Sequence, residues 1–159
     1  MAGRISTRLL RILLPVAFLL STLPGVCVAP QTPPEPLLSE RDALAQEYLN
    51  AQLARWQQRL ELKDWTVAVT LAKPSELRRA TLGNIHWDAT TKTAQIRVLS
   101  AAEYSTSYRA ALRDMEFTLV HELIHLELVS LPRSDASRSD EEYAVNHMAS
   151  ALLRLDRGE

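Results

Sequence analysis

The feature that most constrains this chain is a histidine-glutamate motif, H-E-x-x-H, at residues 121–125, inside an apolar run from residue 115 to 129. Neither proline nor glycine occurs between residues 108 and 131, so the sequence predicts one long helix there. Apolar residues recur nearly all round this helix, as they do in a buried one. Residues four apart lie one turn above each other, so His121 and His125 present their imidazoles to the same point.

Two convergent imidazoles are the ligands that a tetrahedral zinc ion takes from a helix. Glu122 is displaced around the helix from His121, where a carboxylate can reach a metal-bound water without binding the metal itself. A buried polar group without a partner costs about 1–3 kcal/mol, and a metal removes that cost. The motif therefore predicts a zinc site with His121 and His125 as ligands and Glu122 as the catalytic base. The alternative is an accidental motif on a purely structural helix.

Length and charge bound the class of protein. The chain has 159 residues and 47% apolar content, which suits one domain. The first 29 residues hold three arginines and no acid, and the remaining 15 basic residues stand against 19 acidic ones. An acidic body argues against nucleic acid as a partner, because phosphate binding needs a basic face. The sole cysteine, Cys27, lies in the leader, so the domain is expected to have no disulfide.

Residues 1–29 have the pattern of a targeting segment. Three arginines precede an apolar stretch at residues 12–20, and small and turn-forming residues follow at 23–29. The apolar stretch falls short of the roughly 20 residues of a membrane span. We predict a signal peptide and export to the periplasm or the medium. An uncleaved membrane anchor and a lipoprotein remain alternatives.

A proline-rich linker is predicted at residues 30–37, with four prolines within residues 30–36, and the domain is expected to span residues 38–159. Residues 39–62 lack proline and glycine and have apolar residues at helical spacing, which predicts a helix with Ser39 as its N-cap. Trp56 on this helix is expected to pack in the core.

A small sheet should follow this helix. Residues 65–71 alternate between apolar and polar, which predicts a half-buried strand, and residues 82–87 and 94–99 predict two more. Residues 88–93 are expected to form a hairpin turn between the last two. We expect His86 to be a surface residue and not a metal ligand.

A catalytic zinc needs a third protein ligand. The extended motif H-E-x-x-H-x-x-G-x-x-H is excluded, because leucines occupy its glycine place at 128 and its final histidine place at 131. The candidates lie downstream and carry an acid or an imidazole: Glu141, Glu142, His147, Asp135 and Asp140.

The last helix is expected to run from Asp140, as N-cap, to residue 155, with Val145, Met148, Ala149 and Leu152 on its inward stripe. One heptad before Ala149 stands Glu142, which is therefore the preferred third ligand. Asn146, one turn later, is expected to hydrogen-bond the second ring nitrogen of a ligand histidine.

The motif at residues 121–125, followed after a short loop by Glu141-Glu142 and by Val145-Asn146, resembles the minimal zincin metallopeptidases in their glutamate-liganded arrangement. The three strands before it are similar to those of SprT-like and phage-encoded small zincins, and the likeness covers about residues 56–153. It implies a small mixed sheet backed by helices, an edge strand that aligns a peptide, and zinc-dependent peptide hydrolysis. The histidine expected to stabilise the oxyanion has no obvious counterpart, and Tyr104, Tyr108, Tyr143 and His147 are the candidates for that role.

The sequence thus predicts an α+β domain with an N-terminal helix, a small mostly antiparallel or mixed three-stranded sheet, a motif-bearing helix and a C-terminal helix. It predicts an exported zinc metallopeptidase that acts on a peptide or protein substrate. The alternative is a non-catalytic zinc-binding or interaction module attached to the membrane through the N-terminal segment.

Overall fold

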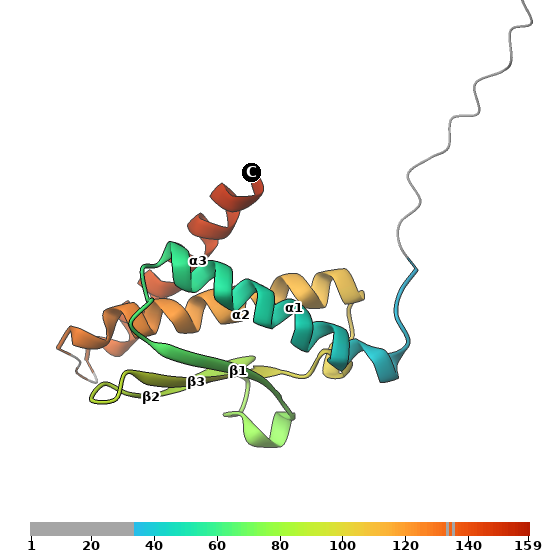
Figure 1. Cartoon of the computed structure of the whole chain (residues 1–159), viewed down its shortest axis with the longest axis horizontal. Helices are drawn as coiled ribbons and strands as arrows, with labels where there is room; N and C mark the ends of the chain where they lie inside the picture. Colours follow the sequence, from blue (N-terminus) through green and yellow to red (C-terminus); the bar gives the residue numbers. More distant parts are fainter. Residues whose placement is uncertain (1–33, 133, 135) are drawn as a thin grey trace, which may run out of the picture. The chain divides into compact units, whose positions relative to one another are not determined.

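The computed structural model describes residues 34–132, 134 and 136–159 (Figure 1). These residues form an α+β unit, as the sequence predicted. Its elements are α1 (Leu38–Arg59), β1 (Thr66–Ala72), η1 (Pro74–Glu76), β2 (Gly83–Asp88), β3 (Thr93–Leu99), η2 (Ala101–Glu103), α2 (Tyr108–Glu127), η3 (Leu128–Ser130) and α3 (Arg138–Arg157).

The sheet is mixed and has the order β1-β3-β2. β3 runs parallel to β1 and antiparallel to β2, so β2 is an edge strand. The predicted hairpin joins β2 to β3. Its turn is held by Asp88, whose carboxylate accepts the backbone N–H of Thr90 at 2.8 Å and that of Thr91 at 3.4 Å.

Helices α1 and α2 lie on the same face of the sheet, and α3 contacts α2 (Figure 1). The residues of β3 alternate, and Ala94, Ile96 and Val98 are buried against this helical layer. Thr66 and Thr70 of β1 are exposed while Val69 between them is buried, which confirms the predicted two-residue period. Trp56 of α1 is 1% exposed, so its predicted place in the core is also confirmed.

Both predicted N-caps are wrong. α1 begins after Leu37, which places Ser39 inside the first turn, and α3 begins after Ser137, which places Asp140 inside its first turn. The helix dipole favours an acid in the first turn, and hydrogen bonding favours an acid at the N-cap. The residue type alone therefore does not determine at which residue a helix begins.

The end of α2 and the buried face of α3 also differ from the prediction. α2 ends at Glu127 and continues to Ser130 as the short turn η3, where the sequence predicted one helix up to a loop that begins at residue 131. The buried stripe of α3 is Val145, Ala149 and Leu153, whereas Met148 is 39% exposed. The stripe advances by four residues at each step, so these three side chains share one face of α3, and Leu152 packs against the core as a partly buried residue.

Gly83 allows β2 to begin unusually close to α2. A Cβ atom on Gly83 would lie 2.4 Å from the Cγ2 atom of Thr118 and 2.8 Å from the carbonyl oxygen of Arg97. Neither distance is tolerable for a methyl group. The missing side chain therefore permits the close approach of the edge strand to the motif-bearing helix.

The compact unit begins at Pro34, so the end of the predicted linker belongs to it. The carboxylate of Glu35 accepts the backbone N–H of Tyr108, at 2.9 Å to Oε2, and a hydrogen bond from Arg41 at 3.1 Å. The predicted targeting segment at 1–29, with Cys27, lies outside the described residues. Within the described part of the chain, no helix is long and apolar enough to cross a membrane.

Candidate metal centre

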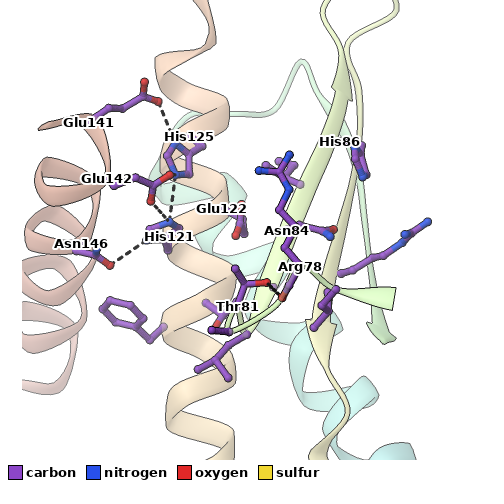
Figure 2. A pocket seen from close by; sticks show the side chains of 18 of the residues that line it. Arg78, Thr81, Asn84, His86, His121, Glu122, His125, Glu141, Glu142 and Asn146 are labelled. Atoms are coloured by element: carbon purple, nitrogen blue, oxygen red, sulfur yellow. Dashed lines mark hydrogen bonds and ion pairs between the residues drawn. The ribbon is translucent and has the colours of Figure 1, made fainter. Parts of the chain in front are cut away.

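His121 and His125 lie on the face of α2 that is turned toward a cleft between β2 and α3 (Figure 2). Their Nε2 atoms are 3.1 Å apart, and the two rings meet edge to face with centroids separated by 4.7 Å. Each imidazole is mostly covered, with side-chain exposures of 15% and 12%. The four-residue spacing thus brings both rings to one point, as predicted.

Glu142 brings a carboxylate to the same point from α3. Its Oε2 atom lies 3.3 Å from Nε2 of His121, and its Oε1 atom lies 3.4 Å from Nε2 of His125. Of the five candidate third ligands, Glu142 alone joins the two histidines in a metal-ligand cluster of the described residues. Its side chain is half exposed at the rim of the cleft, and so does not share the buried stripe on which the sequence placed it.

The three donor groups fit a zinc ion. Two ligand atoms about 2.05 Å from a tetrahedral ion are separated by about 3.3 Å. The two Nε2 atoms are 3.1 Å apart, and the Glu142 carboxylate places one oxygen 3.3 Å from Nε2 of His121 and its other oxygen 3.4 Å from Nε2 of His125, which are all close to that value. Two imidazole nitrogens and one carboxylate oxygen are also the ligand set of catalytic zinc sites that keep a fourth position open.

The outer nitrogens of both rings are held by α3. Nδ1 of His121 lies 3.2 Å from Oδ1 of Asn146, and Nδ1 of His125 lies 3.0 Å from Oε1 of Glu141. If each Nδ1 carries the proton and donates it, each Nε2 presents its lone pair to the metal. The prediction for Asn146 is thus supported by geometry. The contact of Glu141 with Nδ1 of His125 was not predicted, because the sequence indicated Glu141 only as a possible third ligand next to Glu142.

Burial also favours a neutral ring at His121. Removal from water lowers the pKa of the His121 imidazole, and the neighbouring His125 lowers it further. A neutral imidazole keeps the nitrogen lone pair that a metal needs, so this environment prepares the ring for binding a cation.

Glu122 points into the cleft beside the two histidines and faces β2 (Figure 2). It is only 8% exposed, and burial, followed by the charge of Glu142, raises the pKa of its carboxyl to about 7. Among the described residues no hydrogen bond reaches this carboxylate. A buried carboxyl group without a partner is positioned to exchange a proton with something that enters the cleft.

The cleft has a volume of about 750 Å³. The motif-bearing helix forms one wall, β2 and the loop between β1 and β2 (residues 73–82, the β1–β2 loop) form the opposite wall, and α3 closes one end. Its polar lining includes Arg78, Asn84, His86, Arg97 and Arg138. A groove of this size accommodates a short peptide segment.

Several predicted candidates lie elsewhere. Asp140 and His147 are exposed on α3 outside the ligand cluster, and Asp135 lies outside the described residues. His86 is exposed, as predicted, and lines the cleft on β2 without joining the cluster. The four candidates for stabilising an oxyanion are not among the residues that line the cleft: Tyr104, Tyr108, Tyr143 and His147.

Comparison of the chain with models of known protein families, with curated proteins and with solved structures found no match. The class of site is therefore defined by its own geometry, which consists of two imidazoles, a carboxylate and an adjacent buried acid.

Proposed function

We propose that this protein is an exported zinc metallopeptidase. The observation that carries the proposal is the Glu122 carboxyl, which has no hydrogen-bond partner among the described residues and lies beside the convergent ligand groups of His121, His125 and Glu142. A structural zinc site has no use for an acid next to its first ligand, because its coordination sphere is closed. A hydrolytic site needs such an acid to move protons.

His121, His125 and Glu142 would hold the ion. Zinc in such a site acts as a Lewis acid on a carbonyl and makes water acidic enough to attack near neutral pH. Glu122 removes a proton from the attacking water as its oxygen bonds to the scissile carbon. The same carboxyl then gives that proton to the leaving amine as the C–N bond breaks.

The substrate proposed is a peptide or protein, and the arrangement of β2 supports it. β2 is an edge strand that pairs only with β3 in the described sheet, and its residues 83–87 line the cleft. An extended peptide can add to such an edge through backbone hydrogen bonds. This would carry its scissile bond along the wall that faces Glu122.

One observation favours the alternative of a non-catalytic zinc-binding or interaction module. None of the four side chains proposed for stabilising an oxyanion lines the cleft. A site that lacks this group would bind zinc and peptide and hydrolyse poorly. Catalysis is therefore tested separately from metal binding.

The first test measures zinc in the full chain purified without chelators. We expect about one zinc per chain, and loss of that zinc in His121→Ala and Glu142→Ala, because each removes a ligand. Glu141→Ala and Asn146→Ala should weaken zinc binding about 10- to 100-fold, because each leaves a ring nitrogen without its acceptor.

Glu127→Ala is the matched control, because Glu127 is exposed at the end of the same helix. Wild type that neither contains zinc nor takes it up would refute the proposal. Zinc without cleavage of a diverse peptide library would leave the binding module as the function. A reporter fused after Pro36 tests export, and the N-terminal residue of the exported protein then distinguishes a signal peptide, which is removed, from an anchor, which is retained.

A further inference from the structure

We propose that Arg78 binds an acidic side chain of the peptide, so that the enzyme prefers aspartate or glutamate close to the cleaved bond. This inference rests on the proposed function and specifies its substrate class. It starts from the β1–β2 loop, which contributes Arg78 to the cleft wall that faces the motif-bearing helix (Figure 2).

The backbone around Arg78 is fixed on both sides. Leu77, the preceding residue, is buried at 9% exposure. The carbonyl oxygen of Arg78 accepts both the backbone N–H of Thr81, at 3.1 Å, and its hydroxyl, at 2.8 Å. The left-handed conformation of Ala80, with φ of 62°, closes this turn. Arg78 therefore projects from a defined point of the wall.

No carboxylate of the described residues pairs with the Arg78 guanidinium. The nearest acid in sequence, Glu76, accepts the backbone N–H of Lys73 at 2.8 Å. Four other arginines do pair with carboxylates, and all four lie away from the cleft: Arg41, Arg55, Arg59 and Arg157. The chain thus supplies intramolecular partners for those arginines, whereas within the described residues it leaves the three arginines that line the cleft, Arg78 among them, without a carboxylate partner.

The charge balance of the cleft also favours an anionic substrate. Three arginines line it, together with four glutamates, two of which contact the histidines. Once zinc is bound, five positive charges face four carboxylates. A concave site with this excess attracts an entering anion.

A peptide carboxylate is the group that fits a guanidinium best, because the two planar forks can form a pair of parallel hydrogen bonds. Such a carboxylate can belong to a side chain or to the end of the peptide. We assign it to a side chain, because β2 borders the cleft along residues 83–87 and an added strand would extend past both sides of the active site.

The experiment compares pairs of peptides that differ only by glutamate or glutamine at one position on either side of the cleaved bond. Their C-termini are amidated, and a further pair has a free C-terminus. We measure kcat/KM for the zinc-loaded full chain, for Arg78→Ala and for Arg79→Ala. Arg79 is the matched control, because it is exposed in the same loop and does not line the cleft.

Wild type should prefer glutamate over glutamine about tenfold or more at one position, mainly through KM, because a charge-assisted hydrogen bond is lost with glutamine. Arg78→Ala should abolish the preference, whereas Arg79→Ala should retain it. Arg78→Glu should favour lysine at that position. Added salt should weaken the preference in wild type.

The inference is overturned if wild type shows no preference, if Arg78→Ala keeps it, or if Arg79→Ala loses it equally. It is also overturned if only the free C-terminus matters. A second measurement separates this result from the proposed function: binding of the same fluorescent peptides to zinc-loaded Glu122→Gln. If nothing is ever cleaved but binding still depends on glutamate and on Arg78, then catalysis fails and recognition of acidic peptides stands.

Discussion

Helix α2 carries two buried glutamates, six residues apart, in different surroundings. Glu116 in its first half is 4% exposed, and Glu122 in its second half is 8% exposed. Both carboxyl groups were removed from water on folding, which is costly unless something compensates. The two halves of the helix compensate differently.

Glu116 is satisfied entirely by the protein. It accepts hydrogen bonds from the hydroxyl of Tyr48 at 3.1 Å, the indole N–H of Trp56 at 3.2 Å and the guanidinium of Arg157 at 2.9 Å. Tyr48 and Trp56 belong to α1 and Arg157 to α3, so this one carboxylate joins three helices. Its role is to hold the helical layer together.

Glu122 lacks such partners among the described residues, and its carboxyl has a pKa raised to about 7. Its surroundings leave the group open to a molecule in the cleft. The two glutamates differ in the number of hydrogen-bond donors that surround the carboxylate, and this number distinguishes two kinds of buried acid on one helix. A carboxylate with a full set of donors stabilises the fold, and one without donors at the edge of a cleft is a candidate for a role in the site.

The largest effect expected from this comparison is on catalysis. Glu122→Gln keeps the size of the side chain but cannot accept a proton, so kcat should fall about 10²- to 10⁴-fold. Zinc content should stay near that of wild type, because Glu122 is not a ligand. Peptide cleavage and metal analysis on one preparation measure both. Unchanged turnover would mean that another group is the base.

The next effect is on stability. Glu116→Gln removes the charge that compensates Arg157, and should lower the free energy of unfolding by about 2–3 kcal/mol. Zinc content and kcat should change little at temperatures where the variant is folded. Denaturant unfolding followed by circular dichroism measures the loss, with the exposed Glu127→Gln as control. A catalytic defect without a loss of stability would contradict the division between the two acids.

The smallest effect concerns one partner of Glu116. Burial, and then the charge of Glu116, raise the pKa of Tyr48 above its usual value of 10. The folded protein therefore holds this proton to higher pH than the unfolded chain does, so stability is lost as pH rises above 10. Tyr48→Phe should lower the free energy of unfolding by about 1 kcal/mol near neutral pH, because a hydrogen bond to Glu116 is lost. Above pH 10 the free energy of unfolding of this variant should fall less steeply than that of wild type.

Unfolding free energies at pH 7 and at several values above pH 10 test this expectation. Burial also raises the pKa of Tyr104, to about 12, so part of the alkaline loss should persist in the variant. The difference between wild type and Tyr48→Phe isolates the contribution of Tyr48. If the free energies of unfolding of wild type and of Tyr48→Phe fall equally with pH above 10, the hydroxyl of Tyr48 does not contribute to the alkaline loss of stability.

Local periodicity determined most of the fold. The three helices and three strands lie close to their predicted residues, because burial on one face imposes a period of 3.6 on a helix and of 2 on a strand. The convergence of His121 and His125 also followed from sequence, since residues four apart on a helix share a face whatever packs around it. The start of α2 at Tyr108 was predicted correctly, whereas the starts of α1 and α3 were predicted wrongly, because capping residues and first-turn residues are of the same types.

The tertiary structure decided everything that depends on how α3 and α1 lie against α2. The sequence favoured Glu142 among five candidates for the third ligand because Glu142 was expected on the buried stripe of the last helix, but it is the position of α3 along α2 that places Glu142 on both Nε2 atoms and Glu141 on the outer nitrogen of His125. The partners of Glu116 come from 68 and 41 residues away, through Tyr48 and Arg157. Such contacts carry no local period, because they depend on the relative placement of packed elements and not on the geometry of any single one.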